Sequence, residues 1–307
     1  MRISSTQIYQ QGVESMLERQ RELAETQLQV STGKRILRPS DDPSGSVRIL
    51  DLKESEQRLA QYQRNADWAT ARLDQEETAL DSITNILQRV RELNVQGNND
   101  TYTATDRAAI AAEVGQLRDN FLQLVNSQDA NGEYIFSGYR TLSKPMEQTL
   151  NAAGEAQFSY NGDEGQRLLQ IGESREVAIG DPGSIFMNVA SVDPTVVSGE
   201  RAMGEIIDAV AVAFNAGTAS QETLTDLDTA LDRIFTTRAK IGARMNAIDD
   251  QKASNDAFDL AVKDVRSSLE DLDYAEAISR FNQQLTALQA SQQAFLRVQD
   301  LSLFNYL

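Results

Sequence analysis

The chain has 307 residues, a formal net charge of −17 and no Cys or His, and its residues are 40% hydrophobic but only 6% aromatic. The absence of Cys excludes disulfides and thiolate sites, and the absence of His removes the commonest general base and transition-metal ligand. Because the negative charge repels phosphate groups, we expect neither nucleic acid nor an acidic membrane as a partner. The low aromatic content favours helices packed along seams.

Neither a cleavable signal nor a membrane span is expected. The segment "MRISSTQIYQQ" lacks the apolar core of a secretory signal peptide. The most apolar window, Ile206–Phe214, is far shorter than the roughly 20 residues of a membrane span and contains Asp208. We therefore expect a soluble chain with no membrane insertion and, if it is exported, export without signal cleavage.

An amphipathic helix is predicted over residues 9–31. Gln20 and Gln27 fall on its apolar stripe, so the seam is thin and partly polar. Such a helix is either an ordinary surface helix or one that awaits a partner. The stripe positions are Tyr9, Val13, Met16, Leu23 and Val30.

The segment "STGKRILRPSDDPSG", residues 31–45, first resembles a phosphate-binding loop, but its spacing is wrong. A P-loop needs a glycine five positions before Gly33, where this chain has Leu28, and Ser or Thr after Lys34. The segment also lacks the ligand spacing of an EF-hand. We interpret it as a joint in which Gly33 relaxes the backbone and prolines stiffen it.

The joint leads into a long helix that Ser40 or Asp41 can cap, with Pro43 in its first turn. The basic residues Lys34, Arg35 and Arg38 are either solvated or paired with acids of adjacent subunits. The joint residues that we single out are Gly33, Lys34, Arg35, Pro39, Asp41, Asp42 and Pro43.

Periodicity predicts the remaining elements. A helix of about 55 residues, or about 80 Å, runs to about residue 96 and is followed by another over 110–128. Residues 134–200 carry short β-rich runs between Gly, Asn and Asp turns, beginning with "NGEYIFSGY". Helices resume over 203–214 and 224–248, the stripe slips near 252–255 and restarts over 258–272, and a further helix starts at Tyr274.

The predicted fold is mainly α: an elongated antiparallel helical bundle or coiled coil formed by the N- and C-terminal segments, with a small β-rich insert at its far tip. We expect three domains. Residues 1–42 and 265–307 form an inner coiled coil, residues 43–133 and 201–264 form a helical bundle, and residues 134–200 form the β-rich outer insert.

The C-terminal helix contains sixteen consecutive residues, 281–296, without a charge. This composition suits a helix enclosed by other protein, although an ordinary core helix explains it equally well. The apolar tail predicts an interface or a docking motif unless it is covered. The residues concerned are Ile278, Phe281, Leu285, Leu288 and Phe295 on the helix and Leu301, Leu303, Phe304 and Leu307 in the tail.

No catalytic site is predicted. The acid pairs at 41–42, 76–77 and 249–250 are adjacent in sequence, so on a helix their side chains diverge. The chain has no Gly-x-Ser-x-Gly elbow and no His to activate a serine. We therefore expect no enzyme activity, cofactor or metal.

Three segments resemble the bacterial flagellin family. These are "QLQVSTGKRILRPSDDPSGSVRI", "NILQRVRELNVQGNND" and "DLDYAEAISRFNQQLTALQASQQAF". The prolines of "RPSDDP", the entry "NGEYIFSGYRT" and the ending "LSLFNYL" are more similar to the family's hook-associated members than to flagellin itself. The resemblance covers about half of the chain.

The resemblance implies a structural subunit of the bacterial flagellum, placed between hook and filament. It implies type III export without signal cleavage, terminal helices that line the assembled tube, and an outward insert. The implied partners are hook-associated protein 1, flagellin, further copies of this chain in a ring, and an export chaperone on the C-terminal helix. The alternatives are a flagellin filament subunit and, in another class, a soluble coiled-coil scaffold or adaptor.

Overall fold

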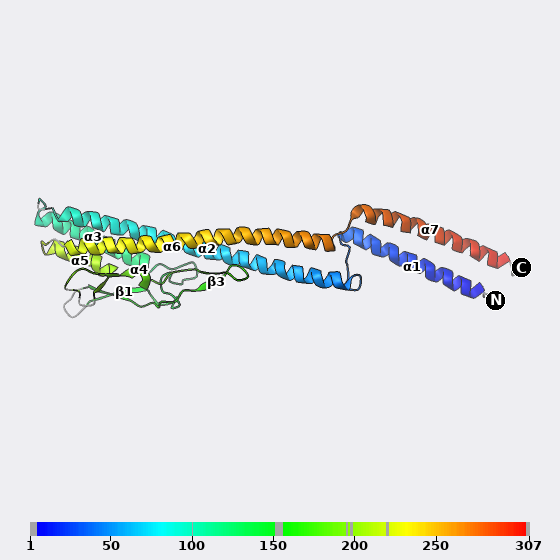
Figure 1. Cartoon of the computed structure of the whole chain (residues 1–307), viewed down its shortest axis with the longest axis horizontal. Helices are drawn as coiled ribbons and strands as arrows, with labels where there is room; N and C mark the ends of the chain where they lie inside the picture. Colours follow the sequence, from blue (N-terminus) through cyan, green and yellow to red (C-terminus); the bar gives the residue numbers. More distant parts are fainter. Residues whose placement is uncertain are drawn as a thin grey trace. The chain divides into compact units, whose positions relative to one another are not determined.

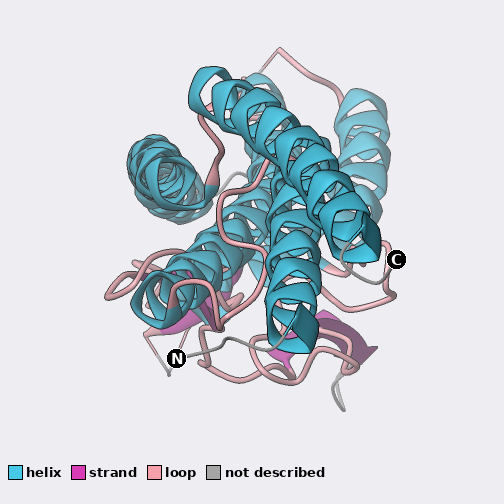
Figure 2. Ribbon diagram, turned by 90° about the vertical axis from the view of Figure 1, so that its right-hand side faces the viewer, coloured by secondary structure: helices cyan, strands magenta, loops and turns pink. Residues whose placement is uncertain are grey.

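The computed structural model describes residues 5–99, 101–150, 156–194, 196, 199–218 and 221–304. Within them the chain is mainly helical, with three small two-stranded antiparallel sheets (Figures 1 and 2). The helices are α1 (Ser5–Thr32), α2 (Pro43–Gly97), α3 (Ala104–Val125), α4 (Ser184–Met187), α5 (Met203–Asn215), α6 (Gln221–Glu270) and α7 (Tyr274–Phe304). The strands are β1 (Met146–Leu150), β2 (Ala156–Tyr160), β3 (Leu168–Gln170), β4 (Glu176–Ala178), β5 (Asn188–Ala190) and β6 (Glu200–Ala202). The predicted mainly α fold class is confirmed.

The chain divides into two compact units. The terminal unit joins Met1–Leu59 to Ala257–Leu307, and the central unit is Ala60–Asp256. Both limits fall inside α2 and α6, whereas the predicted domains end at the joint and at residue 264. The ends of these two long helices belong with the terminal helices because both contact the joint. The predicted division into three domains stays a prediction.

Helix α2 runs without a break and contributes much of the central core. Its buried stripe includes Leu73, Leu80 and Leu87, all fully inaccessible to solvent. Antiparallel to it lies α6, and Arg238 of α6 pairs with Glu77 at 2.7 Å. Helices α2 and α6 are therefore the two main helices of the bundle, as the heptad-like spacing predicts.

One predicted helix limit needs correction, and the predicted slip of the stripe in α6 has a physical cause. Helix α3 ends at Val125 rather than near 128, because Gln128 pairs with Tyr134 in an isolated antiparallel bridge. The slip of the apolar stripe predicted near 252–255 falls inside α6, which is continuous there. The polar residue on the stripe there, Asn255, is buried because its side-chain amide donates to the Ile171 carbonyl at 2.9 Å.

The β-rich insert is not at the tip of the bundle. Its β1, β3 and α4 lie alongside α6 and α5 in Figure 1. Phe136, Phe158 and Phe186 of the insert are buried in the same cluster as the α2 and α6 stripes. The predicted placement at the far tip is therefore wrong: the insert packs on the helices and shares their core, since it is small for a core of its own.

The entry to the insert is not a strand. Residues 135–139 form turns, and Gly138 has a positive φ of 69°. A Cβ there would lie 2.2 Å from Asp163 Oδ1, so only glycine fits. Further on, the predicted β-rich stretch of residues 134–200 does contain strands, among them β2, β3 and β4.

Glu76 is a carboxylic acid in the middle of the central core. Its side chain is inaccessible, Oε1 accepts a hydrogen bond from the Asp181 N–H at 3.1 Å, and Oε2 has no partner among the described residues. Burial, and then the neighbouring Asp181 carboxylate, raises the pKa of Glu76 to about 8, although Arg244 and Arg72 oppose the shift. Glu76 is therefore protonated in the folded chain at neutral pH.

The raised pKa of Glu76 predicts that the free energy of unfolding decreases as the pH rises. Because the folded-state pKa of Glu76 exceeds the ordinary 4.5, its contribution is most favourable below about pH 4.5 and is lost as the pH rises through about 8. Glu76→Gln keeps the acceptor oxygen but cannot ionise. We expect it to raise the free energy of unfolding at pH 8 by on the order of 2–4 kcal/mol.

Urea unfolding of both proteins at pH 5 and pH 8 measures this effect. The control is Glu77→Gln, which removes the neighbouring carboxylate that pairs with Arg238 and should leave the pH slope unchanged. An identical pH slope in the wild type and Glu76→Gln would contradict the prediction.

Candidate assembly site

The two terminal helices pack on each other. Helix α1 lies along α7 (Figure 1), and the pair is antiparallel, since Gly12 lies against the Phe295 ring and Gly33 against Tyr274. A Cβ on Gly12 would come within 3.1 Å of that ring, so the glycine allows the close approach. The structure thus brings the two predicted helices together within one chain.

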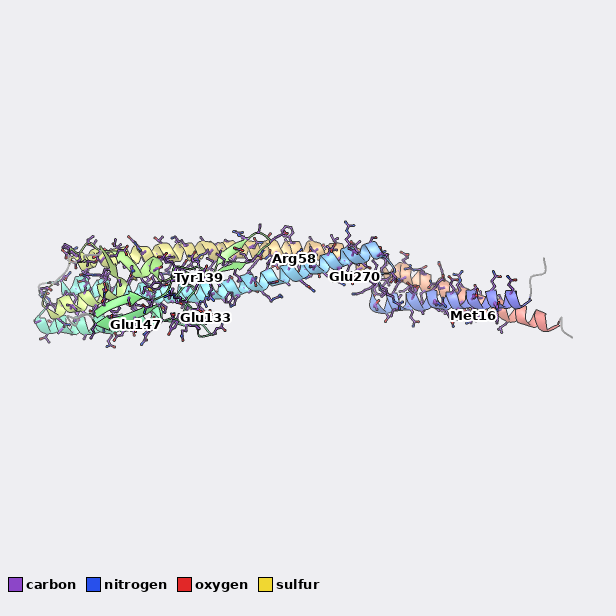
Figure 3. All side chains as sticks on the ribbon, turned by 90° about the horizontal axis from the view of Figure 1, so that it is seen from below. Met16, Arg58, Glu133, Tyr139, Glu147 and Glu270 are labelled. Atoms are coloured by element: carbon purple, nitrogen blue, oxygen red, sulfur yellow. The ribbon has the colours of Figure 1, made fainter. Side chains whose placement is uncertain are left out.

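The predicted stripe of α1 faces this contact only in part. Val13, Met16, Leu23 and Val30 are all half-buried, and Met16 is labelled in Figure 3. The buried residue of α1 is instead Thr26, whose hydroxyl donates to the Glu22 carbonyl at 3.0 Å. The seam is as thin as Gln20 and Gln27 on the stripe suggest.

On α7 the predicted positions divide into three groups. Leu288 is buried, Phe281 and Phe295 are half-buried, and Ile278 and Leu285 are exposed. The uncharged stretch therefore has one helix as its neighbour and still presents apolar side chains to solvent.

The remaining tail and stripe predictions cannot be placed at the level of side chains. Tyr9 lies in α1, and Leu301, Leu303 and Phe304 lie in α7, with side chains outside the described residues. Leu307 lies outside the described residues altogether.

The joint closes α1 and returns the chain to α2. Gly33 has a φ of +70° and donates its N–H to the Gln29 carbonyl at 2.8 Å, which ends α1 as an αL cap. A Cβ on Gly33 would lie 2.8 Å from the Tyr274 hydroxyl. The predicted need for glycine at this position therefore has two physical causes.

The joint is hydrogen-bonded to the segment that links α6 and α7. The Leu272 N–H donates to the Gly33 carbonyl at 3.0 Å, and the Arg35 N–H donates to the Glu270 carbonyl at 2.8 Å. Lys34 and Asp271 form an isolated antiparallel bridge between these bonds. Residues 33–35 and 270–272 therefore form a short two-stranded pairing, which we call the clasp.

Glu270 anchors the clasp electrostatically (Figure 3). Its Oε1 accepts from Lys34 Nζ at 2.7 Å and from Lys53 Nζ at 3.2 Å. Burial by itself raises the pKa of Glu270, but the hydrogen bonds from the two lysines outweigh it and the pKa is lowered. The ion pairs are therefore complete at neutral pH and are lost as the pH falls through the folded-state pKa.

The basic joint residues are predicted to be either solvated or paired with acids of adjacent subunits. Lys34 instead pairs with Glu270 of its own chain. Arg35 likewise donates from its guanidinium to the Leu269 carbonyl at 2.8 Å. Arg38 is exposed and, within the described residues, forms no ion pair. Pro39 is also exposed.

Asp42, rather than Ser40 or Asp41, caps α2. Its carboxylate accepts from the Gly45 N–H at 2.9 Å, and this bond, followed by one from Ser44, lowers its pKa. Pro43 occupies the first helical position, as predicted. Asp41 instead closes the preceding turn by accepting from the Arg38 N–H at 2.8 Å, which likewise lowers its pKa.

The acidic pair at 76–77 does not converge on one site. Glu76 is buried while Glu77 turns to Arg238, so this acid pair diverges as predicted. Within the described residues no group of acidic side chains is placed to hold a metal ion, and no helix there is long and apolar enough to cross a membrane. What the clasp and the helix pair offer is a surface for other protein.

The sequence analysis missed Glu270, Lys53 and Asp273. Asp273 caps α7 by accepting from the Ala275 N–H at 2.9 Å, and an Asp followed by a restarting stripe could have revealed it. Glu270 has no such local signal, because its partner Lys34 is 236 positions away.

Comparison with known proteins identifies the class. The bacterial flagellin N-terminal helical region matches residues 3–141, and the flagellin C-terminal helical region matches residues 224–307. The chain belongs to the bacterial flagellin family, which confirms the resemblance in its terminal segments.

Within the family, the chain is 31% identical to flagellar hook-associated protein 3 of Escherichia coli strain K12, over 99% of both chains. Flagellin FlaB2 of Treponema pallidum is 30% identical over 84% of both chains. The flagellar junction protein FlgL from Legionella pneumophila shares the fold, with a TM-score of 0.60 and 20% identity over 74% of this chain and 100% of that one. The predicted likeness to the hook-associated members is confirmed, and these relatives are structural flagellar proteins.

The clasp predicts a specific effect of losing Gly33. Gly33→Ala forces a Cβ into a left-handed backbone and against the Tyr274 hydroxyl, which should destabilise the terminal unit by about 1–3 kcal/mol. We expect faster amide hydrogen exchange at the end of α1 and the start of α7, measured by mass spectrometry.

A matched control is Gly217→Ala. Gly217 has a similar φ of +72° but open space around its Cβ, and it lies in the central unit. It should loosen the end of α5 and leave α1 and α7 unchanged. Unaltered exchange of both terminal helices in Gly33→Ala would show that the clasp does not hold them.

Proposed function

We propose that this chain is a structural subunit that joins the hook of the bacterial flagellum to its filament. The observation that carries this proposal is the similarity to hook-associated protein 3 along 99% of both chains, which includes the insert as well as the terminal helices. A protein at such a junction must contact two different neighbours, and surfaces on both units are available for that task.

The proposal assigns the terminal helices to assembly. The thin seam between α1 and α7 leaves Leu17, Leu28 and Leu296 exposed as well as Ile278 and Leu285. Exposed apolar side chains of this number favour burial against neighbouring subunits. In this proposal the stripe and tail residues, from Tyr9 to Leu307, are the continuous inner contacts, and Gly33 to Pro43 form the joint that directs them.

A filament subunit is the second candidate. The flagellin relatives support it, since both kinds of protein share the terminal regions. Growth of the purified chain into long filaments would favour it over a junction protein. The scaffold or adaptor alternative has lost its basis, because the chain belongs to a family of flagellar proteins.

The partners follow from this role as part of the proposal. They are hook-associated protein 1 on the hook side, flagellin on the filament side, and further copies of this chain in a ring. We propose export through the flagellar type III apparatus, with a chaperone that holds the uncharged C-terminal helix beforehand.

Deletion of the gene from its own bacterium tests the function. We expect cells with complete hooks, no attached filaments and flagellin released into the medium, and a return of filaments when the full chain is supplied. The readouts are electron microscopy and immunoblots of the culture medium. Filaments that remain attached without the chain would refute the proposal, and a loss of flagellin secretion would indicate an earlier role.

The tail gives a further prediction. Removing residues 301–307 takes away four apolar side chains without touching the central core, so filament attachment or chaperone affinity should fall while the melting transition of the central unit stays. A control that removes exposed apolar side chains elsewhere is Leu142→Ser with Leu150→Ser. Attachment and chaperone affinity equal to those of the full chain would contradict the assignment.

A further inference from the structure

A groove lies beside the clasp, between the joint and the first turns of α2. It has a volume of about 490 Å³ and belongs wholly to the terminal unit. We call it the joint groove. Its lining combines apolar Ile36, Ile49 and Leu50 with basic Lys34, Arg38 and Lys53 and one acid, Glu270, which pairs with both lysines.

The joint groove is a basic site in an acidic chain. Residues 33–53 carry five Lys and Arg against three Asp, whereas the whole chain has a net charge of −17. The Asp41 and Asp42 carboxylates accept from backbone N–H groups, and Arg38 attracts Asp41 electrostatically but makes no close ion pair within the described residues. Leu50 is 66% exposed at the wall of the groove, which therefore offers an apolar surface beside the exposed Arg38.

A second surface of the same unit has the complementary character. Phe258, Ala261 and Val265 follow one another at helical spacing on α6, and all three are exposed. We call them the α6 stripe. Phe258 is 62% exposed, and Asp264, which adjoins the stripe, is exposed and forms no ion pair within the described residues. The nearby Asp259, by contrast, is paired with Lys263 at 2.5 Å.

We propose that the α6 stripe of one copy of this chain docks in the joint groove of the next copy, with Asp264 pairing with Arg38. The inference rests on the proposed junction role and specifies how the ring of copies is held. Because copies with a charge of −17 repel one another, contact between them is favoured where a basic surface meets an acidic one. The joint groove and the α6 stripe provide that match together with apolar area.

The two surfaces are different parts of one unit, so the contact is head-to-tail. None of the α6 stripe residues lines the joint groove of its own chain. A contact between unlike surfaces leaves a free groove at one end and a free stripe at the other, and repetition closes a ring when the rotation permits. This geometry suits a junction that must end after one layer of subunits.

Introduced cysteines test the contact directly, because the chain has none of its own. Leu50→Cys in the groove and Ala261→Cys in the stripe are combined in one full-length chain and supplied to the deletion strain. Flagella are sheared off, oxidised and analysed on a denaturing gel. We expect a ladder of cross-linked copies longer than dimers, since each copy bonds to two neighbours.

The matched control pairs Leu50→Cys with Leu260→Cys. Leu260 adjoins Ala261 and is 63% exposed, but it points to another side of α6. A ladder with Ala261→Cys and none with Leu260→Cys supports the proposal. Dimers from Leu50→Cys alone would mean that grooves face each other and would overturn it. Attached filaments without any ladder would also overturn the proposed contact, but they would leave the junction role intact. If the wild-type chain restored no filaments, the junction role itself would be refuted.

Charge reversal provides a second measurement that does not depend on cysteine geometry. Arg38→Asp and Asp264→Arg each place like charges in contact, so each should lower the number of filaments per cell roughly two- to fivefold. The double variant restores opposite charges and should recover the wild-type number. Failure of the double variant to exceed the single variants, with all three folded by circular dichroism, would overturn the pairing.

Discussion

The terminal unit depends on one constraint: the chain passes through it in two segments, residues 33–35 and 270–272, which are hydrogen-bonded to each other. The bonds from Leu272 to Gly33 and from Arg35 to Glu270 fix where α1 ends and where α7 begins. Because these bonds fix α1 and α7 relative to each other at one end, a thin seam of side chains is enough to keep the two helices aligned. The positive φ of Gly33 and the paired carboxylate of Glu270 are the local conditions for that clasp.

The sequence predicts features that depend on neighbours along the chain. The need for glycine at position 33 and the place of Pro43 follow from the local preferences of those residue types, and the long helices follow from their spacing. Features that depend on distant residues are not predicted. Glu270 meets Lys34 only in the folded chain, and Asn255 breaks the α6 stripe because the insert packs there.

The same distinction explains the misplaced insert. Its strands are readable from alternation and turns, but the side of the bundle that they cover depends on which helical surface accepts Phe136, Phe158 and Phe186. A short β-rich segment has too little apolar area to fold alone, so its position is decided by the helices. Turn residues and strand periodicity contain no information about that choice.

The two units differ in how much of their apolar surface they bury within a single chain. The central unit buries faces of four helices, α2, α3, α5 and α6, together with the insert in one cluster and can even retain a neutral glutamic acid there. The terminal unit buries little, carries glutamines on its seam and exposes Phe258 and Leu260 on α6 and leucines on α7. Since the net charge of −17 opposes association, these apolar side chains alone would not select a partner. A basic groove set beside them makes the association selective, because it accepts an acidic apolar surface only where the two charge patterns match.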